Sequence, residues 1–300
     1  MTTRIETRER IEGALVGLAI GDALGAPVEH MDRQAIATAY PLGVSGYVDR
    51  PPSGVRPGQG TDDTEMAFLV ADSIATQQRL DMDDIVHRLI VWGRDYPALG
   101  PSTGAGIAAL IEGAPWDEAG QTATASSGCL PRCAPVALVA TPSRLVIDTL
   151  RCCQPTHRHP LALAASVAQN LVLERLIRGV SWEAAYAVLM DGAEPPVDDL
   201  AFIRDALRGE FSLPGAIDVL AEAMRCVNDV QDAESALLAS VHLGGDTDTR
   251  GAVAGALAGA RWGISGFPQH WIDGCEASAT ALSLGSSLAA VRQTAFSRGA

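Results

Sequence analysis

Apolar residues recur at three- and four-residue spacing along most of the chain, and the alternating, β-branched runs typical of strands are scarce. Glycine or proline separates nearly every pair of periodic segments. The segment 31–60 has four prolines and no helical pattern, so we expect a long loop there. The chain is therefore predicted to be all-α, with helices over 6–24, 64–79, 83–95, 103–113, 159–178, 181–190, 198–208, 214–227, 232–242, 249–262 and 276–296.

The predicted helix at 249–262 is built almost wholly of small residues. Gly251, Gly255 and Gly259 recur at every fourth position, and an alanine follows each of them. Because such a stripe lets the backbone of a neighbouring helix approach closely, we expect this helix to be buried at the centre of the protein. Arginines flank its apolar part, which is too short to span a bilayer.

The amino-acid composition limits the classes of protein to which the chain can belong. The chain has 300 residues, of which 47% are hydrophobic, so it can bury a large core in one domain or two. A formal net charge of -14 argues against binding to nucleic acid or to an anionic membrane, since both require a basic surface. In the N-terminal segment, charged residues precede the apolar part and Asp22 interrupts it, which favours neither an export signal nor a membrane anchor. The six cysteines lack the paired CxxC spacing of structural zinc sites, so we expect reduced core thiols in a cytoplasmic protein.

The stretch GGDTDT at 244–249 combines turn-forming residues with acids at the start of an apolar helix. Its two glycines allow the backbone angles of a tight turn. Residues two apart do not share a helix face, so Asp246 and Asp248 converge most easily if the first lies in the turn and the second near the helix start. Ordinary helix capping is the alternative, because Asp and Thr are favoured at helix N-termini.

A similar stretch, GTDDT at 60–64, occurs about 180 residues earlier, where Thr61 can cap a helix whose first turn holds Asp62 and Asp63. Helix capping alone would explain one such stretch, but its recurrence favours a functional role for the acids. Two clusters of acids and threonines, without His or Cys between the acids, suit a hard cation such as Mg²⁺ or Mn²⁺ better than zinc. Four carboxylates are too many for one Mg²⁺ and suit two ions that share a bridging acid.

Other candidate residues lie outside these two stretches. Asp22, near the end of the first predicted helix, is expected to be solvated, whereas Glu29 could point inward. Gly100, Ser102 and Thr103 belong to a turn before a helix, where free N–H groups and the helix dipole favour an anion such as phosphate. An ordinary helix start explains that turn equally well.

Two basic side chains have open interpretations. Arg132 is the one arginine of the stretch 126–138, and it could bind a phosphate bidentately or pair with a structural acid. His157 precedes a predicted apolar helix. Taken alone, it is interpreted as an ordinary core or surface histidine.

Five stretches together resemble the ADP-ribosylglycohydrolase family, which includes the dinitrogenase-reductase-activating glycohydrolases of bacteria. They are GALVGLAIGDALGAPVE at 13–29, GTDDTEMA at 60–67, SSGCLPRCAPVAL at 126–138, PTH at 155–157 and GGDTDTRGAVAGALAGARWG at 244–263. The resemblance spans about the whole chain, and the pair TDDT and GGDTDT is its specific signal. It implies one all-α orthogonal helix bundle over residues 1–300 that binds two Mg²⁺ or Mn²⁺ ions in a cleft.

The resemblance also implies roles for individual residues. Enzymes of the family release ADP-ribose from a modified side chain, commonly arginine, by cleaving the bond at the anomeric carbon of the distal ribose. Glu29 matches the acid at the end of the family's first motif and is a candidate general base, with Asp63 and Asp246 as further catalytic carboxylates. The implied metal ligands are Thr61, Asp62, Asp63, Asp246, Asp248 and Thr249. The implied substrate contacts are Gly100, Ser102, Thr103, Ser127, Gly128 and His157.

This chain departs from the family at a few positions. The family often has Asn where Ser127 stands and Met where Pro131 stands, and an acid commonly lies where this chain has Ala98 and Leu99. These replacements do not change any of the implied metal ligands. They lie among the implied substrate contacts. With 5% aromatic residues, the sequence singles out no ring for stacking on adenine.

Two other function classes fit the same residues. One is a module that binds ADP-ribose without turnover, and the other is a two-metal phosphohydrolase that attacks phosphorus. The acceptor, the choice between Mg²⁺ and Mn²⁺ and the oligomeric state stay open at this level. An ADP-ribosylated protein or small molecule is the expected partner.

Overall fold

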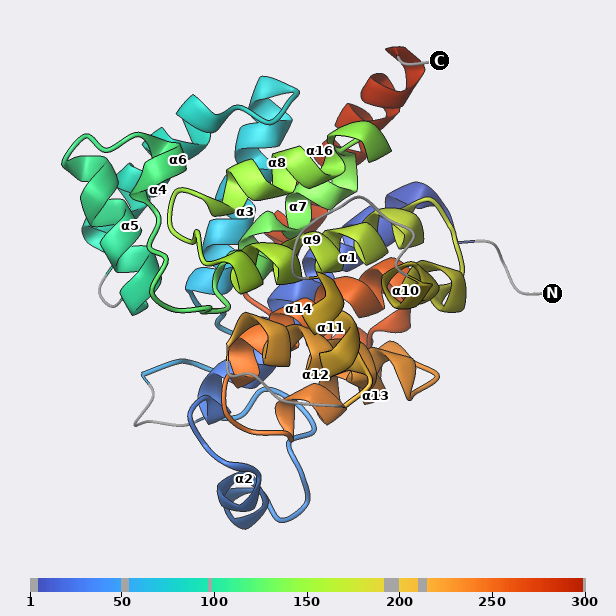
Figure 1. Cartoon of the computed structure of the whole chain (residues 1–300). Coiled ribbons are helices and arrows are strands. Elements are labelled where there is room, and N and C mark those ends of the chain that lie inside the picture. Colours follow the sequence, from blue (N-terminus) through green and yellow to red (C-terminus); the bar gives the residue numbers. More distant parts are fainter. Residues whose placement is uncertain (1–4, 50–53, 97–98, 192–199, 210–214, 299–300) are drawn as a thin grey trace.

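A computed structural model describes residues 5–49, 54–96, 99–191, 200–209 and 215–298 (Figure 1). Within these residues the regular elements are all helical, apart from two isolated β-bridges. The helices are α1 (Thr7–Gly25), α2 (Arg33–Ala39), α3 (Asp62–Gln77), α4 (Met82–Asp95), α5 (Pro101–Ile111), α6 (Trp116–Ala119), α7 (Cys129–Val139), α8 (Pro142–Cys153), α9 (Pro160–Ile177), α10 (Trp182–Asp191), α11 (Leu200–Leu207), α12 (Ala216–Asn228), α13 (Ala233–Val241), α14 (Thr247–Trp262), α15 (Gln269–Gly274) and α16 (Ser278–Arg298), with the 3-10 helices η1 (Ala26–Val28) and η3 (Ile264–Gly266).

The predicted all-α class is confirmed, and each predicted helix overlaps an observed one. Five further helices, α2, α6, α7, α8 and α15, lie outside the predicted helix ranges. α2 lies in the segment expected to be a loop, where the Asp32 side chain caps it by accepting from the N–H of Ala35 at 2.7 Å. α7 contains prolines, one of them, Pro135, inside the helix, and these hide its helical pattern.

α1 and α14 form the centre of the fold and run antiparallel with their backbones in contact. A Cβ atom added at Gly17 would lie 2.2 Å from the carbonyl oxygen of Gly255, and one added at Gly251 would lie 2.2 Å from that of Gly21. Both helices therefore need their glycines. The predicted close approach to the 249–262 helix is confirmed, and its partner is α1. This packing places the end of α1 beside the start of α14.

Several helices pack around this central pair, whereas α4, α5 and α6 form a group at one side of the molecule (Figure 1). α16 packs on α1, whereas α9, α12 and α13 pack on α14. α7 joins α3, α8 and α9, so it links the first acid-bearing helix to the rest of the core. All six cysteines are buried and free, as expected for core thiols.

Two helical stretches, Thr7–Val28 and Pro160–Ile177, are long and apolar enough to cross a membrane by length and composition. In the fold, 94% and 78% of their most apolar windows are buried. Their hydrophobicity therefore serves the core contacts that place α1 and α9 inside the bundle.

Candidate active site

The start of α14 is held against the segment that follows α1. Gly244 and Gly245 have φ angles of 76° and 78°, in the left-handed region that glycine adopts without strain. The N–H of His30 donates to the carbonyl of Gly245 at 2.9 Å, and the N–H of Gly245 donates to the carbonyl of Met31 at 2.7 Å. The predicted tight turn before Asp246 is present, and these bonds fix it to the chain next to Glu29.

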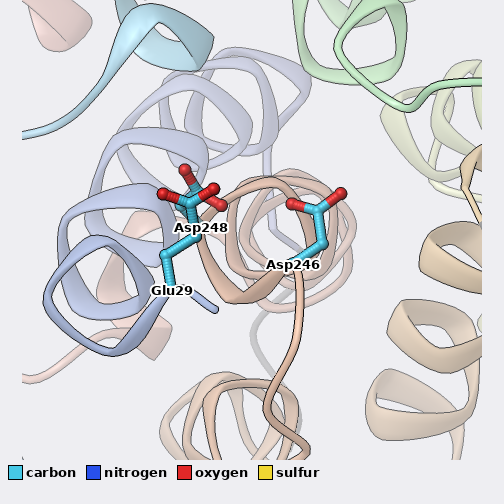
Figure 2. Close-up of side chains that lie close together, drawn as sticks. All are labelled: Glu29, Asp246 and Asp248. Carbon is cyan, nitrogen blue, oxygen red and sulfur yellow. The ribbon is translucent and has the colours of Figure 1, made fainter. Parts of the chain in front are cut away.

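Three carboxylates meet at this point. One oxygen atom each from Glu29, Asp246 and Asp248 lies within 4.8 Å of the other two. Figure 2 shows Glu29 coming from the segment after α1 and the two aspartates from the start of α14. The Thr247 hydroxyl points the other way, into α1, and donates to the carbonyl of Gly25 at 2.8 Å. Because Asp and Thr alternate, the side chains of Asp246 and Asp248 lie at the acid cluster. The Thr247 side chain instead fixes the start of α14 to α1.

The acid stretch at 60–64 is held beside these carboxylates by Asp22 of α1. This carboxylate is fully buried and accepts from the N–H of Thr61 at 2.9 Å and from the N–H and hydroxyl of Thr64 at 3.1 and 2.5 Å. The expectation that Asp22 is solvated was wrong, because it caps the first turn of α3, whose N–H groups lack helical partners. Asp22 therefore ties the start of α3 to α1. Burial raises its pKa to about 6.

The acids of the two stretches act on one another. Asp63 and Asp248 are 3% and 6% exposed, and burial raises the pKa of both well above the ordinary value. The charge of Asp62 raises the pKa of Asp63 further, and the charge of Asp63 does the same for Asp248. Asp246 contributes to both shifts. A bound cation would relieve this repulsion, and the oxygen-only donor set suits Mg²⁺ or Mn²⁺.

Every site residue expected from the sequence lines one cavity of about 710 Å³. At one end are the acids and threonines Glu29, Thr61, Asp62, Asp63, Asp246, Asp248 and Thr249. The expected substrate contacts line the same cavity, namely Gly100, Ser102, Thr103, Ser127, Gly128 and His157. Segments far apart in the sequence are thus brought together around a space large enough for a nucleotide-sized ligand.

The polar groups of the cavity wall are partly engaged with one another. The Ser127 hydroxyl donates to Asp246 Oδ2 at 2.6 Å, so this side chain contacts the acid cluster directly. Ser102 accepts from Gln121 Nε2 at 2.8 Å and lies 2.6 Å from the Ser126 hydroxyl. Through these hydrogen bonds, Ser102 connects the start of α5 to the loop before α7.

His157 is a buried, neutral residue of this wall. Only 1% of its surface is exposed, and its Nδ1 lies 2.7 Å from the hydroxyl of Thr156. Burial, together with the positive charge of Arg132, lowers the pKa of His157 to about 3. At neutral pH the imidazole is uncharged.

Arg132 takes neither of the roles considered for it. Its guanidinium is fully buried and donates from Nη2 to the carbonyl oxygens of Cys152 and Cys153 at 3.3 and 3.0 Å. These carbonyls lie at the end of α8, where that of Cys153 also accepts from the N–H groups of Thr156 and His157 at 3.2 and 3.0 Å, so the arginine adds a side-chain cap to that helix end. Burial raises the pKa of Asp62, and the positive charge of Arg132 offsets part of that rise.

Tyr96 was missed by sequence reasoning. It follows α4, lines the cavity, and lies with its ring centroid 4.7 Å from that of Trp92. A lone tyrosine in a Gly- and Pro-rich loop carries no signal that separates it from an ordinary surface residue. Leu99 also lines the cavity, whereas Ala98 lies outside the described residues.

The sequence profile of the ADP-ribosylglycohydrolase family matches residues 3–298. The ADP-ribosyl-dinitrogen reductase glycohydrolase of Rhodospirillum rubrum is 33% identical over 276 residues, which cover 88% of this chain and 89% of that protein. The ADP-ribosylarginine hydrolase Tri1 of Serratia proteamaculans is 30% identical over 282 residues, covering 89% of this chain and 75% of the relative. A solved structure described as an ADP-ribosylglycohydrolase-related protein complex superposes with a TM-score of 0.83 at 30% identity, covering 96% of this chain and 99% of that one. The chain therefore belongs to the ADP-ribosylglycohydrolase family.

Proposed function

We propose that this protein is a divalent-cation-dependent hydrolase of the glycosidic bond between ADP-ribose and an acceptor, with an ADP-ribosylated arginine side chain as the substrate. The observation that carries the proposal is the convergence of Glu29, Asp246 and Asp248 at one end of a cavity of about 710 Å³. Family membership and relatives whose names specify ADP-ribosyl and ADP-ribosylarginine hydrolysis support it. Residues 1–300 are proposed to act as one domain.

Two Mg²⁺ or Mn²⁺ ions would be held by the oxygen atoms of Thr61, Asp62, Asp63, Asp246, Asp248 and Thr249. Buried carboxylates that repel one another are a fitting donor set, because cation binding stabilises their charged forms. When bound, the ions supply Lewis-acid chemistry that polarises substrate oxygens and lowers the pKa of water.

Glu29 is proposed as the general base. Its side chain is 35% exposed, so water can reach it, and it lies at the acid end of the cavity. A glycosidic bond to ribose breaks through an oxocarbenium-like state, which needs a proton acceptor for the incoming water. The surrounding carboxylates, Asp63 and Asp246 among them, favour the positive charge that develops on the ribose ring.

The diphosphate is proposed to lie against the starts of α5 and α7. Gly100 to Thr103 begin α5 and Gly128 precedes α7, so main-chain N–H groups at two helix starts line the cavity. A Cβ atom added at Gly128 would lie 3.7 Å from Thr103 Oγ1 and 3.8 Å from His157 Cε1, which places these residues around one spot. Neutral His157 adds no charge there and can take part as a hydrogen-bonding group.

The test is to incubate the purified protein with ADP-ribosyl-arginine in Mg²⁺ or Mn²⁺ and to identify the product by chromatography. Release of free ADP-ribose and arginine is expected. Release of AMP would instead support a phosphohydrolase that uses the same acids. Binding of ADP-ribose without any release would support a binding module and contradict the proposal.

A further inference from the structure

Tyr96 lies at the end of a row of three side chains that runs outward from the acid end of the cavity. Its ring contacts Trp92, one turn earlier on α4, with the planes at 38°. The indole Nε1 of Trp92 donates to Glu65 Oε2 at 2.7 Å. Glu65 is exposed and follows Asp62 by three residues on α3, so both acids project from the same side of that helix.

The row lies in a negative field. Tyr96 is half-buried, and besides burial the charges of Asp62 and Glu65 raise the pKa of its phenol, which keeps the hydroxyl protonated. An aromatic ring flanked by carboxylates attracts a cation, because the electron-rich ring face and the negative charges act in the same direction.

The place of the row relative to the acids indicates which part of the substrate it meets. If the acid cluster binds the distal ribose, the diphosphate extends toward the starts of α5 and α7, and the acceptor leaves on another side. Tyr96 lines the cavity together with Asp62, whereas Trp92 and Glu65 continue outside it. The row therefore borders the path of the acceptor.

We propose that Tyr96 and Glu65, braced by Trp92, form an acceptor subsite that binds the guanidinium group of an ADP-ribosylated arginine. This inference rests on the proposed function. A guanidinium is planar, stacks on aromatic faces and pairs with carboxylates, so it can use both side chains at once. A hydroxyl-linked acceptor such as serine gains neither interaction.

The kinetic test compares Tyr96→Leu and Glu65→Gln with two controls. Tyr96→Phe keeps the ring, and Glu112→Gln changes an exposed acid that does not line the cavity. We expect Tyr96→Leu to raise KM for ADP-ribosyl-arginine about tenfold with little change in kcat, and Glu65→Gln to raise it less. Tyr96→Phe, which retains the ring face, should raise KM less than Tyr96→Leu does, and Glu112→Gln should match the parent protein. An unchanged KM in Tyr96→Leu would overturn the subsite.

A binding test separates this subsite from the catalytic proposal. The Kd of free ADP-ribose, which lacks the acceptor, should be the same in Tyr96→Leu and in the parent protein. N-acetyl-arginine amide, titrated in the presence of ADP-ribose, should bind the parent more tightly than N-acetyl-lysine amide does and should lose about tenfold in Tyr96→Leu. Equal weakening of free ADP-ribose would assign the ring to the nucleotide and overturn the inference. Arginine-amide binding without any ADP-ribose release would retain the subsite and reject the proposed reaction.

Discussion

His157 is a single buried residue whose protonation couples the cavity wall to stability. Its folded pKa is about 3, whereas the ordinary value is about 6.5, so between these pH values the unfolded chain binds a proton that the folded protein excludes. The stabilising contribution is therefore complete above about pH 6.5 and is lost as pH falls toward 3, by about 1.4 kcal/mol for each pH unit once the unfolded form is fully protonated.

We predict that His157→Gln flattens the acid side of the stability profile. The free energy of unfolding, measured by urea denaturation at a series of pH values, should fall less steeply below about pH 6.5 in this variant than in the parent protein. His87→Gln, which removes an exposed histidine, is the matched control and should keep the parental slope. Identical slopes for parent and His157→Gln would show that the imidazole is not held neutral in the fold.

Residues whose environment is set by distant segments escape prediction from sequence. Asp22 looks like a lone acid at a helix end, yet it caps α3 from another helix. From the sequence, Arg132 could bind a phosphate or pair with an acid, yet it caps the end of α8. Tyr96 carries no local signal, because only the packing of α4 turns its ring toward the cavity. The partners of Asp22 and Arg132 lie at least 20 residues away, so the local sequence pattern is uninformative.

At the scale of elements, the contact between α1 and α14 sets the position of the acids. We predict that Gly255→Ala destabilises the protein by about 2 kcal/mol, because the new Cβ would lie 1.9 Å from the carbonyl oxygen of Gly17 and the helices must separate. Gly104→Ala in α5 is the control, since its added Cβ meets only Leu99 Cβ at 3.5 Å. Denaturant unfolding of both variants checks this. Equal stabilities would contradict backbone contact between α1 and α14.

The glycine stripe of α14 could be predicted from the sequence because its cause is local: small residues at four-residue spacing permit only one kind of neighbour. The partner helix could not be predicted, although α1 carries a matching stripe that includes Gly21. α7 shows the opposite case, where Pro131 and Pro135 hide a helix whose packing against α3, α8 and α9 outweighs the lost hydrogen bond.

At the scale of the whole molecule, the acid cluster links cation binding to folding. Because the repelling carboxylates come together only in the folded protein, a divalent cation binds the folded form preferentially and stabilises it. We predict that millimolar Mn²⁺ raises Tm by several degrees over the EDTA-treated protein, while K⁺ at the same ionic strength does not. In Asp248→Asn, the cation-free Tm should be higher and the response to Mn²⁺ lost. An equal change in Tm with Mn²⁺ and with K⁺ would contradict a site that is specific for divalent cations.

The convergence of two acid stretches could be expected from the sequence because the same Gly, Thr and Asp pattern opens two apolar helices, and isolated buried acids are costly. The fold adds how they meet. Asp22 ties α3 to α1, and the Gly244–Gly245 turn ties α14 to the segment that contains Glu29. Neither tie is visible before the helices are packed.

The central claim is that carboxylates from α3 and from the start of α14 form one cation site. Calorimetric titration of Mn²⁺ into the parent protein, Asp62→Ala and Asp246→Ala tests it most directly, with circular dichroism to show that all three are folded. We predict that each substitution alone weakens Mn²⁺ binding severely, because both segments supply ligands to the same ions. Parental Mn²⁺ affinity and stoichiometry in either folded variant would contradict a shared site.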